Sequence, residues 1–150
     1  MLVSGIVAAT CALALISLGG GLYEVSVVDK AWPRRFDIVQ PGRGGISRRR
    51  FWIPAHVAFE VGLVVALVAA WSAPAVRIWL LLALASHVSM RLWSAFDFIP
   101  KAVAFERTEA TAEEETRAVR WARRSRWRLP LDVLTCAAML MAFANEVRIG

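Results

Sequence analysis

Ionisable side chains stand inside stretches of this chain that are otherwise apolar, and several of them are spaced four residues apart. Side chains with that spacing share one face of an α-helix. Charged groups inside a membrane helix are costly, and they usually face the interior of a helix bundle or a wet cavity. The pairs with this spacing are His56 and Glu60, His87 and Arg91, and Arg128 and Asp132. Groups of these types can remove protons and stabilise a developing negative charge.

The side chains best suited to acid/base catalysis are Glu60, His56, Arg91, His87 and Glu24. Glu60 or His56 would act as the general base, and Glu24 is the next candidate. Arg91 would hold a developing oxyanion, while His87 would relay or donate a proton. We expect these residues to form the catalytic part of a site.

Other polar and aromatic side chains of the same segments are candidates for substrate binding. They are Tyr23, Ser94, Trp93, Asp97, Arg128 and Asp132. Three of them have structural alternatives. Arg128 could extend its guanidinium group to the membrane interface, and Asp132 could serve only as the partner of Arg128. Asp97 could cap the end of its helix or pair with an arginine of a loop.

The depths of these groups agree with one another. At about 1.5 Å per helical residue, Glu24, His56 and Asp132 lie roughly 5–8 Å inside one boundary of the membrane. Glu60 and Arg91 lie about 13 Å inside it. The opposite halves of the second and third apolar segments carry no ionisable side chain. We therefore predict one interior polar space, open toward one side of the membrane, that these five residues share.

Metal binding is an alternative use of the same residues. One mononuclear site could be built from His56, His87, Glu24 and Glu60, since four-helix bundles hold metals between facing helices. A di-iron site would need Glu-x-x-His repeats, which the sequence lacks. We predict no metal and no cofactor.

The elements that carry these residues are predicted from the apolar segments. The chain is 58% hydrophobic with a mean hydropathy of +0.52, and one membrane helix needs about 20 apolar residues. We predict helices over residues 2–28, 51–71, 77–100 and 108–147. The expected fold is all-α: a single domain over residues 1–150 that forms a four-transmembrane-helix bundle. Pro100 should end the third helix.

The segment before the last apolar stretch is predicted to be an interfacial helix that leads into the fourth span. Thr111 and Glu114 fit a capping box at its start. Arginines follow, with Trp121 and Trp127 among them, as in helices that lie at a membrane surface. A solvated charged helix is the alternative.

The charge pattern predicts the orientation. The net charge is +6, and most Lys and Arg fall in two loops, residues 29–51 and 101–128. Four spans put both loops on one side, and the positive-inside rule makes that side cytoplasmic. We expect a multi-pass protein of the cell membrane with both termini external. Anionic lipid is the expected partner of the basic loops; nucleic acid is not expected, and a homo-oligomer stays open.

The layout resembles a family of small four-helix membrane proteins that includes the fungal anthrone oxygenases. The residues that carry the resemblance are Gly21-Leu22-Tyr23, Pro33, Arg91 with Phe98-Ile99-Pro100, Trp121, Arg128 and Asp132. The resemblance covers nearly the full length, although Ser125 stands where the family often has Asn. It implies oxidation of a polycyclic phenolic substrate without an obvious cofactor. A base would remove an activated C–H proton, and the resulting carbanion would react with O₂.

These observations predict a small membrane enzyme that acts by acid/base chemistry on a lipophilic substrate from the inner leaflet. Two other classes of function stay open. The polar residues could fix helix packing in a non-catalytic membrane subunit, or they could relay protons in a coupled transporter. The sequence shows no internal repeat, which many transporters contain.

Overall fold

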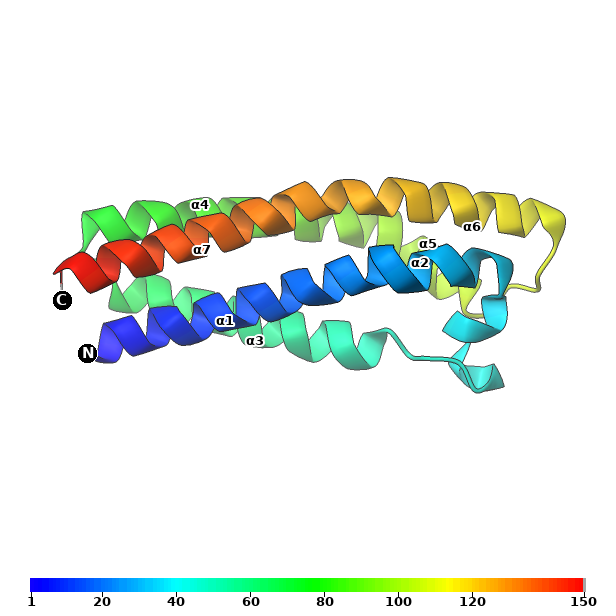
Figure 1. Ribbon diagram of the computed structural model, residues 1–150, viewed down its shortest axis with the longest axis horizontal. Coiled ribbons are helices and arrows are strands. Elements are labelled where there is room, and N and C mark those ends of the chain that lie inside the picture. The colour runs from blue at the N-terminus through cyan, green and yellow to red at the C-terminus, as the bar shows by residue number, and fades with distance from the viewer. Residues whose placement is uncertain (150) are drawn as a thin grey trace.

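The computed structural model describes residues 1–149, which form an all-α bundle of four long antiparallel helical rods (Figure 1). Within those residues the rods long and apolar enough to cross a membrane are Leu2–Arg34, Arg49–Ala69, Pro74–Phe105 and Ala112–Ile149. The predicted fold class is confirmed, and the protein is a multi-pass membrane protein. Both termini lie at one end of the bundle, here called the terminal end. The opposite end, which holds residues 24–48 and 94–128, is called the loop end.

The rods contain α-helices, π-helical turns and 3-10 turns in chain order. The α-helices are α1 (Leu2–Tyr23), α2 (Asp29–Ala31), α3 (Arg49–Ala69), α4 (Pro74–Trp93), α5 (Ile99–Phe105), α6 (Ala112–Ser125) and α7 (Leu129–Ile149). The π-helical turns are Glu24–Val28 and Ser94–Phe98, and the 3-10 turns are Trp32–Arg34, Phe36–Val39, Pro41–Arg43 and Arg126–Arg128. The predicted bounds of the spans were therefore too short at the loop end for the first and third rods.

Pro100 does not end the third helix, contrary to the prediction. It lies in the first turn of α5, where a backbone N–H has no helical partner to lose. The π-helical turn Ser94–Phe98 directly precedes it and changes the hydrogen-bonding register of the helix. The rod therefore continues to Phe105.

The fourth rod begins at Ala112, four residues later than predicted, because Thr111 caps it. The Thr111 hydroxyl accepts a hydrogen bond from the Glu114 backbone N–H at 3.3 Å, as the capping motif predicts. The rod has 38 residues, or about 57 Å at about 1.5 Å per residue. The apolar layer is about 30 Å thick, a length that α7 covers alone. Helix α6 therefore extends beyond it.

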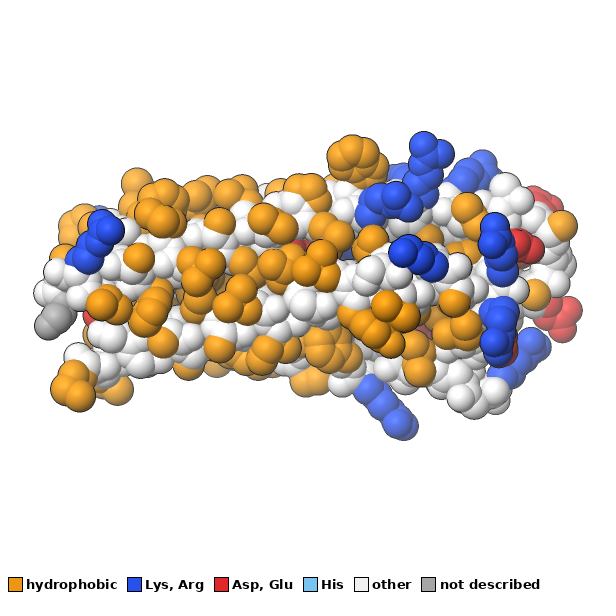
Figure 2. All heavy atoms as spheres, in the orientation of Figure 1, with side chains coloured by type: hydrophobic (Ala, Val, Ile, Leu, Met, Phe, Trp, Pro, Cys, Tyr) orange, Lys and Arg blue, Asp and Glu red, His pale blue; other side chains and the backbone are white. Residues whose placement is uncertain are grey.

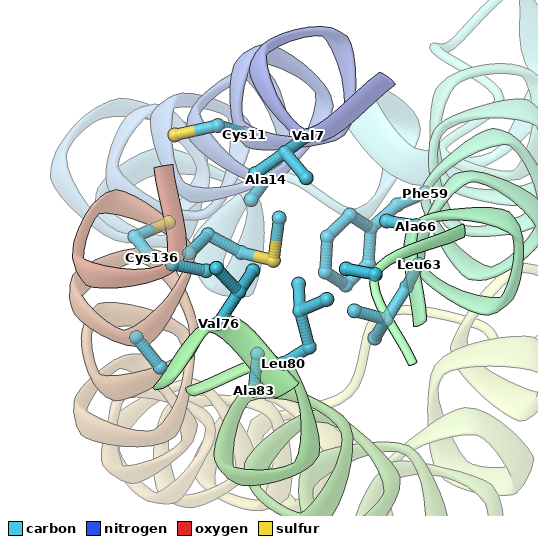
Figure 3. Close-up of a cluster of buried hydrophobic side chains, with 14 residues drawn as sticks. Val7, Cys11, Ala14, Phe59, Leu63, Ala66, Val76, Leu80, Ala83 and Cys136 are labelled. Carbon is cyan, nitrogen blue, oxygen red and sulfur yellow. The ribbon is translucent and has the colours of Figure 1, made fainter. Parts of the chain in front are cut away.

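The helices pack in the order α3, α1, α7, α4, and α3 touches α4 over a much smaller region than the other neighbours share. Lipid tails are as apolar as the helix surfaces, so the hydrophobic effect does not drive helices together inside a membrane. Close packing there depends on small residues, which let the backbones approach. The core of the terminal end, here called the terminal core, contains many of them (Figure 3). Its small members are Cys11, Ala14, Ala66, Ala70, Ala83, Cys136, Ala138 and Ala142. Cys11 and Cys136 are free thiols, as expected for packing residues.

A second core, the loop-end cluster, is aromatic. It is built mainly from Trp32, Phe36, Phe98, Phe105 and Trp121, whose rings pack edge to face. Trp121 is 7% exposed because its helix, α6, lies against the turn Trp32–Arg34. Trp121 therefore packs inside the protein instead of facing lipid, while Trp127 is 67% exposed. Figure 2 shows the outer surface: apolar side chains cover the long helices, and most of the charged ones gather at the loop end.

Candidate functional site

A cavity of about 260 Å³ lies between the rods at the inner edge of the loop end. It brings together six of the predicted site residues: Glu24, His56, Arg91, Ser94, Arg128 and Asp132. Both π-helical turns border it, and they contribute Glu24 and Ser94. Such turns are rare in proteins overall but occur often at functional sites, because the extra residue turns side chains in new directions.

The Glu24 carboxylate accepts hydrogen bonds from two side chains at the start of the second rod. Arg48 Nη1 donates to Glu24 Oε1 at 3.0 Å, and Trp52 Nε1 donates to Oε2 at 2.9 Å. The Arg48 guanidinium lies 5.2 Å and 5.3 Å from the ring centroids of Trp32 and Trp121. Stacking on two indoles and pairing with a carboxylate fix this guanidinium. Glu24 is therefore held as an ion pair at the cavity wall.

Arg128 enters the cavity from the turn before α7 and is held by hydroxyl and carbonyl oxygens. It donates to Ser94 Oγ at 2.9 Å, to Ser125 Oγ at 2.7 Å and to the Ser125 carbonyl at 3.3 Å. Its guanidinium also lies 4.5 Å from the centroid of Phe98. Within residues 1–149 no carboxylate forms an ion pair with Arg128 at 4.0 Å or less. Its positive charge is thus oriented but not neutralised.

Asp132 lines the cavity from the first turn of α7. The described part of the chain provides neither a hydrogen bond nor an ion pair to its carboxylate, so the expected pair with Arg128 is not formed. Gly21 lies beside it and makes room for its neighbour Leu129: a Cβ atom on Gly21 would lie only 3.1 Å from a Leu129 methyl group, but at an ordinary contact distance of 3.9 Å from Asp132 Oδ2. A charged carboxylate without a partner inside a bundle is costly, so this group must take up a proton or be satisfied by water or a bound molecule.

His56 faces the same cavity from α3. Its ring stacks on Trp52 with centroids 5.2 Å apart and planes 21° apart, and it lies 5.6 Å from the ring of His87. Among the described residues, His56 Nδ1 is buried and has no hydrogen-bond partner. Buried polar atoms are nearly always paired. This nitrogen can therefore bind a ligand or exchange a proton with it.

Glu60 and His87 line a different space, a groove of about 250 Å³ between α3 and α4. Arg91 Nε donates to Glu60 Oε1 at 3.0 Å, and His87 Nε2 lies 3.2 Å from the same oxygen. Arg91 lines both the groove and the cavity. The single polar space predicted from the depths is therefore two adjoining spaces, and Glu60 does not line the cavity.

The remaining predicted residues lie outside both spaces. Tyr23 is 60% exposed on the outer surface, and Trp93 packs edge-on against Phe98. Asp97 pairs with Lys101 and accepts a hydrogen bond from Arg124 at 2.6 Å. This geometry matches the alternative in which Asp97 pairs with a loop arginine.

Sequence reasoning missed Arg48 and Trp52, which hold Glu24 and support the His56 ring. A signal for both was present. Arg48, Trp52, His56 and Glu60 are each four residues apart, so they continue one face of a helix that begins at Arg49. Arg48 was counted only as a topology signal because it falls in a basic loop. Arg49, which pairs with Glu106 at the cavity wall, was missed for the same reason.

Residues 1–149 contain no group of three or more His, Cys, Asp or Glu side chains arranged to hold a metal ion. The ligand set considered from the sequence is divided, since Glu24 is bound to Arg48 and Glu60 to Arg91. No protein-family model, curated protein or solved structure matches the chain. The class that fold and composition define is a small multi-pass membrane protein with a polar cavity in one half of its bundle.

Proposed function

We propose that the protein is a membrane enzyme that binds a lipophilic molecule and removes a proton from a carbon that a carbonyl group activates. Asp132 is the general base, with His56 as a second proton acceptor in the same cavity, and Arg128 and Arg91 stabilise the oxyanion that forms. One observation carries this proposal: Asp132, Arg128 and His56 line the cavity, yet neither Asp132 nor Arg128 has an ion-pair partner within 4.0 Å among the described residues, and the buried His56 Nδ1 has no hydrogen-bond partner there. Packing alone does not account for three such groups, because each has a desolvation cost.

The chemistry follows from the types and positions of these groups. A positioned base increases the rate of a proton transfer about 10²–10⁴-fold. Fixed donors near the developing negative charge act strongly in a site with little water. The hydroxyl groups of Ser94 and Ser125 keep the Arg128 guanidinium oriented before a substrate binds. We assign the role of general base to Asp132 instead of Glu60, because the Glu60 carboxylate is bound by Arg91 and His87 in the groove.

The finer reaction is oxygenation of an activated carbon, as the resemblance to the anthrone oxygenases implies. The base removes the proton from the ring carbon opposite the carbonyl of an anthrone, and the negative charge spreads onto the carbonyl oxygen. The carbanion then reacts with O₂. One oxygen atom becomes the new carbonyl and the other leaves as water, so that anthrone and O₂ give anthraquinone and water.

The test uses the purified chain in lipid nanodiscs with anthrone as substrate. Oxygen uptake and quinone absorbance should rise together, above the rate in empty nanodiscs. Asp132→Asn should lower the rate by about 10²–10⁴. The matched control is Asp37→Asn, because Asp37 lies in an exposed loop and pairs with Arg35 at 2.8 Å. An unchanged rate in Asp132→Asn, or no enzymatic rate in the unaltered chain, contradicts the proposal.

A non-catalytic role in packing is the second candidate, and the number of paired charges favours it. Glu24 with Arg48, Glu60 with Arg91, Glu106 with Arg49 and Asp97 with Arg124 all form ion pairs. The melting temperature of Asp132→Asn separates the two roles. Removing an unpaired buried carboxylate should maintain or raise stability if the residue serves catalysis. A packing role requires a clear loss.

The loop end faces the cytoplasm in this proposal, with anionic lipid around its basic residues. The lipophilic molecule then reaches the cavity from the inner leaflet. A transport role has less support, because the terminal core fills the other half of the bundle with packed apolar side chains (Figure 3). An ion would have to pass this apolar core to cross the membrane.

A further inference from the structure

The groove between α3 and α4 opens on the side of the bundle that lipid surrounds. These two helices follow one another in the chain, yet they lie close together over only a small part of their length. Apart from three polar residues, the groove is lined by Leu63, Val64, Leu84, Val88, Leu92 and Ala95. Val64 and Leu92 are 55% and 54% exposed. The groove is therefore an apolar channel that acyl chains or rings can enter from the bilayer.

The polar residues of the groove lie where it meets the cavity. The side chains of Glu60 and Arg91 are 42% and 35% exposed, although they stand midway along apolar helices. Charged groups at that depth normally face protein or water, so something must cover this pair in the membrane. Arg91 uses its Nε on Glu60 and also borders the cavity. Its positive charge is thus shared between the two spaces.

We propose that the groove is the lateral entrance of the cavity and the binding site for the apolar part of the same ligand. This inference rests on the proposed function and specifies its substrate class: an amphiphile with an apolar body and one oxygen-bearing head that becomes negatively charged, as the carbonyl end of an anthrone does. The head passes Arg91 and reaches Arg128, while the body stays between α3 and α4 and covers Glu60. The two spaces, about 260 and 250 Å³, together reach the range of about 300–1,000 Å³ that is usual for ligand pockets.

The occupant is a small amphiphile rather than a second protein helix for two reasons. The groove shares Arg91 with a cavity that holds an oriented arginine without an ion-pair partner among the described residues, Arg128. A docked helix would cover the groove and leave that cavity empty. The charge at the junction is also complementary to an anionic head group, because Arg91 brings donors beyond the one that Glu60 uses.

The experiment uses palmitic acid with a diazirine at the end of its chain, and the methyl ester of the same probe. The chain is held in nanodiscs, irradiated, and the labelled peptides are mapped by mass spectrometry. The acid should label the α3–α4 groove, near Val64, Val88 and Leu92, about tenfold more than the ester, as expected for one charge-assisted hydrogen bond. Arg91→Gln should abolish that difference while leaving the labelling of other lipid-facing positions unchanged.

A matched pair of tryptophan variants separates the groove from general lipid contact. Val64→Trp fills the groove and should remove the acid-specific labelling. Val68→Trp lies one turn away on the same helix, is 71% exposed and does not line the groove, so it should have no effect. Equal labelling by acid and ester, or labelling that Val64→Trp leaves intact, means ordinary lipid contact and overturns the inference. A disulfide between copies of Val64→Cys shows that a second copy covers the groove, and it overturns the inference as well.

Different experimental results would contradict the proposed function and the proposed entrance. Asp132→Asn should keep the acid-specific labelling of the groove while losing turnover of anthrone. If the acid labels only residues of the cavity, the entrance is wrong and the catalytic proposal stands. If the groove is labelled as expected but Asp132→Asn keeps full turnover, the entrance stands and the catalytic proposal is wrong.

Discussion

Arg48 performs a role that no other cation of the loops could fill. Its planar guanidinium stacks on Trp32 and Trp121 while donating to Glu24 at 3.0 Å. Lysine keeps the charge but cannot stack and donate in that geometry. We expect Arg48→Lys to lower the stability of the bundle by about 1–3 kcal/mol, the worth of a partly buried cation–π and charged hydrogen-bond group. Thermal unfolding in detergent measures this.

The control for Arg48→Lys is Arg50→Lys. Arg50 is exposed at the start of α3, so its substitution should leave the melting temperature unchanged. Equal melting temperatures for the two variants would mean that the contacts of the Arg48 guanidinium with Trp32, Trp121 and Glu24 contribute nothing.

Glu60 and Arg91 should depend on each other for stability. Glu60→Gln leaves the Arg91 guanidinium without a counter-charge in an apolar setting, and breaking one side of such a pair costs more than removing both. We expect Glu60→Gln to lower the melting temperature, and the double variant with Arg91→Gln to recover part of the loss. A double-mutant cycle measures the coupling. Additive losses would contradict a direct pair.

Much of the candidate site followed from residue types and spacing. Depth and shared faces predicted that Glu24, His56, Arg91 and Asp132 meet, and all four line the cavity. Spacing shows which residues of one helix share a face, but it does not show which neighbouring helix or space that face meets. That is why Glu60, on the same face of α3 as His56, falls into a separate groove.

Close packing of α1 on α3 rests on Gly62. A Cβ atom there would lie 2.9 Å from Thr10 Oγ1 and 3.4 Å from its methyl group, so the helices must move apart to accept it. We expect Gly62→Ala to destabilise the bundle by about 1–3 kcal/mol, as overpacking does. Gly19→Ala is the control, since nothing lies within 4 Å of a Cβ there. It should be neutral or slightly stabilising, because alanine favours the helix.

The long helices could be predicted from apolar length, and the start of α6 from its capping residues. The order in which the helices pack could not. Apolar residues surround α1 and α7 on every face, as in membrane spans generally, so no stripe marks the side that meets a neighbour. The separation of α3 from α4 was not predictable for the same reason.

The orientation of the whole bundle is open to direct measurement. We expect the loop end to be cytoplasmic, because both basic loops lie there. Ser47→Cys should react with a membrane-impermeant maleimide only after permeabilisation, and Ser72→Cys should react in intact cells. The native thiols are buried in the bundle and should stay unlabelled. The reverse pattern of labelling would invert the assignment.

The two π-helical turns let the loop end hold an additional residue without changing the direction in which the later side chains face. Each turn accommodates one residue more than an α-helix would at that place. Deleting Val27, an exposed residue of the first turn, should therefore restore α-helical winding and leave the later residues of the rod facing as before. Trp32 would then stay in the loop-end cluster, and Arg48 would keep both of its indoles. A relative one residue shorter at this point can therefore have the same aromatic cluster.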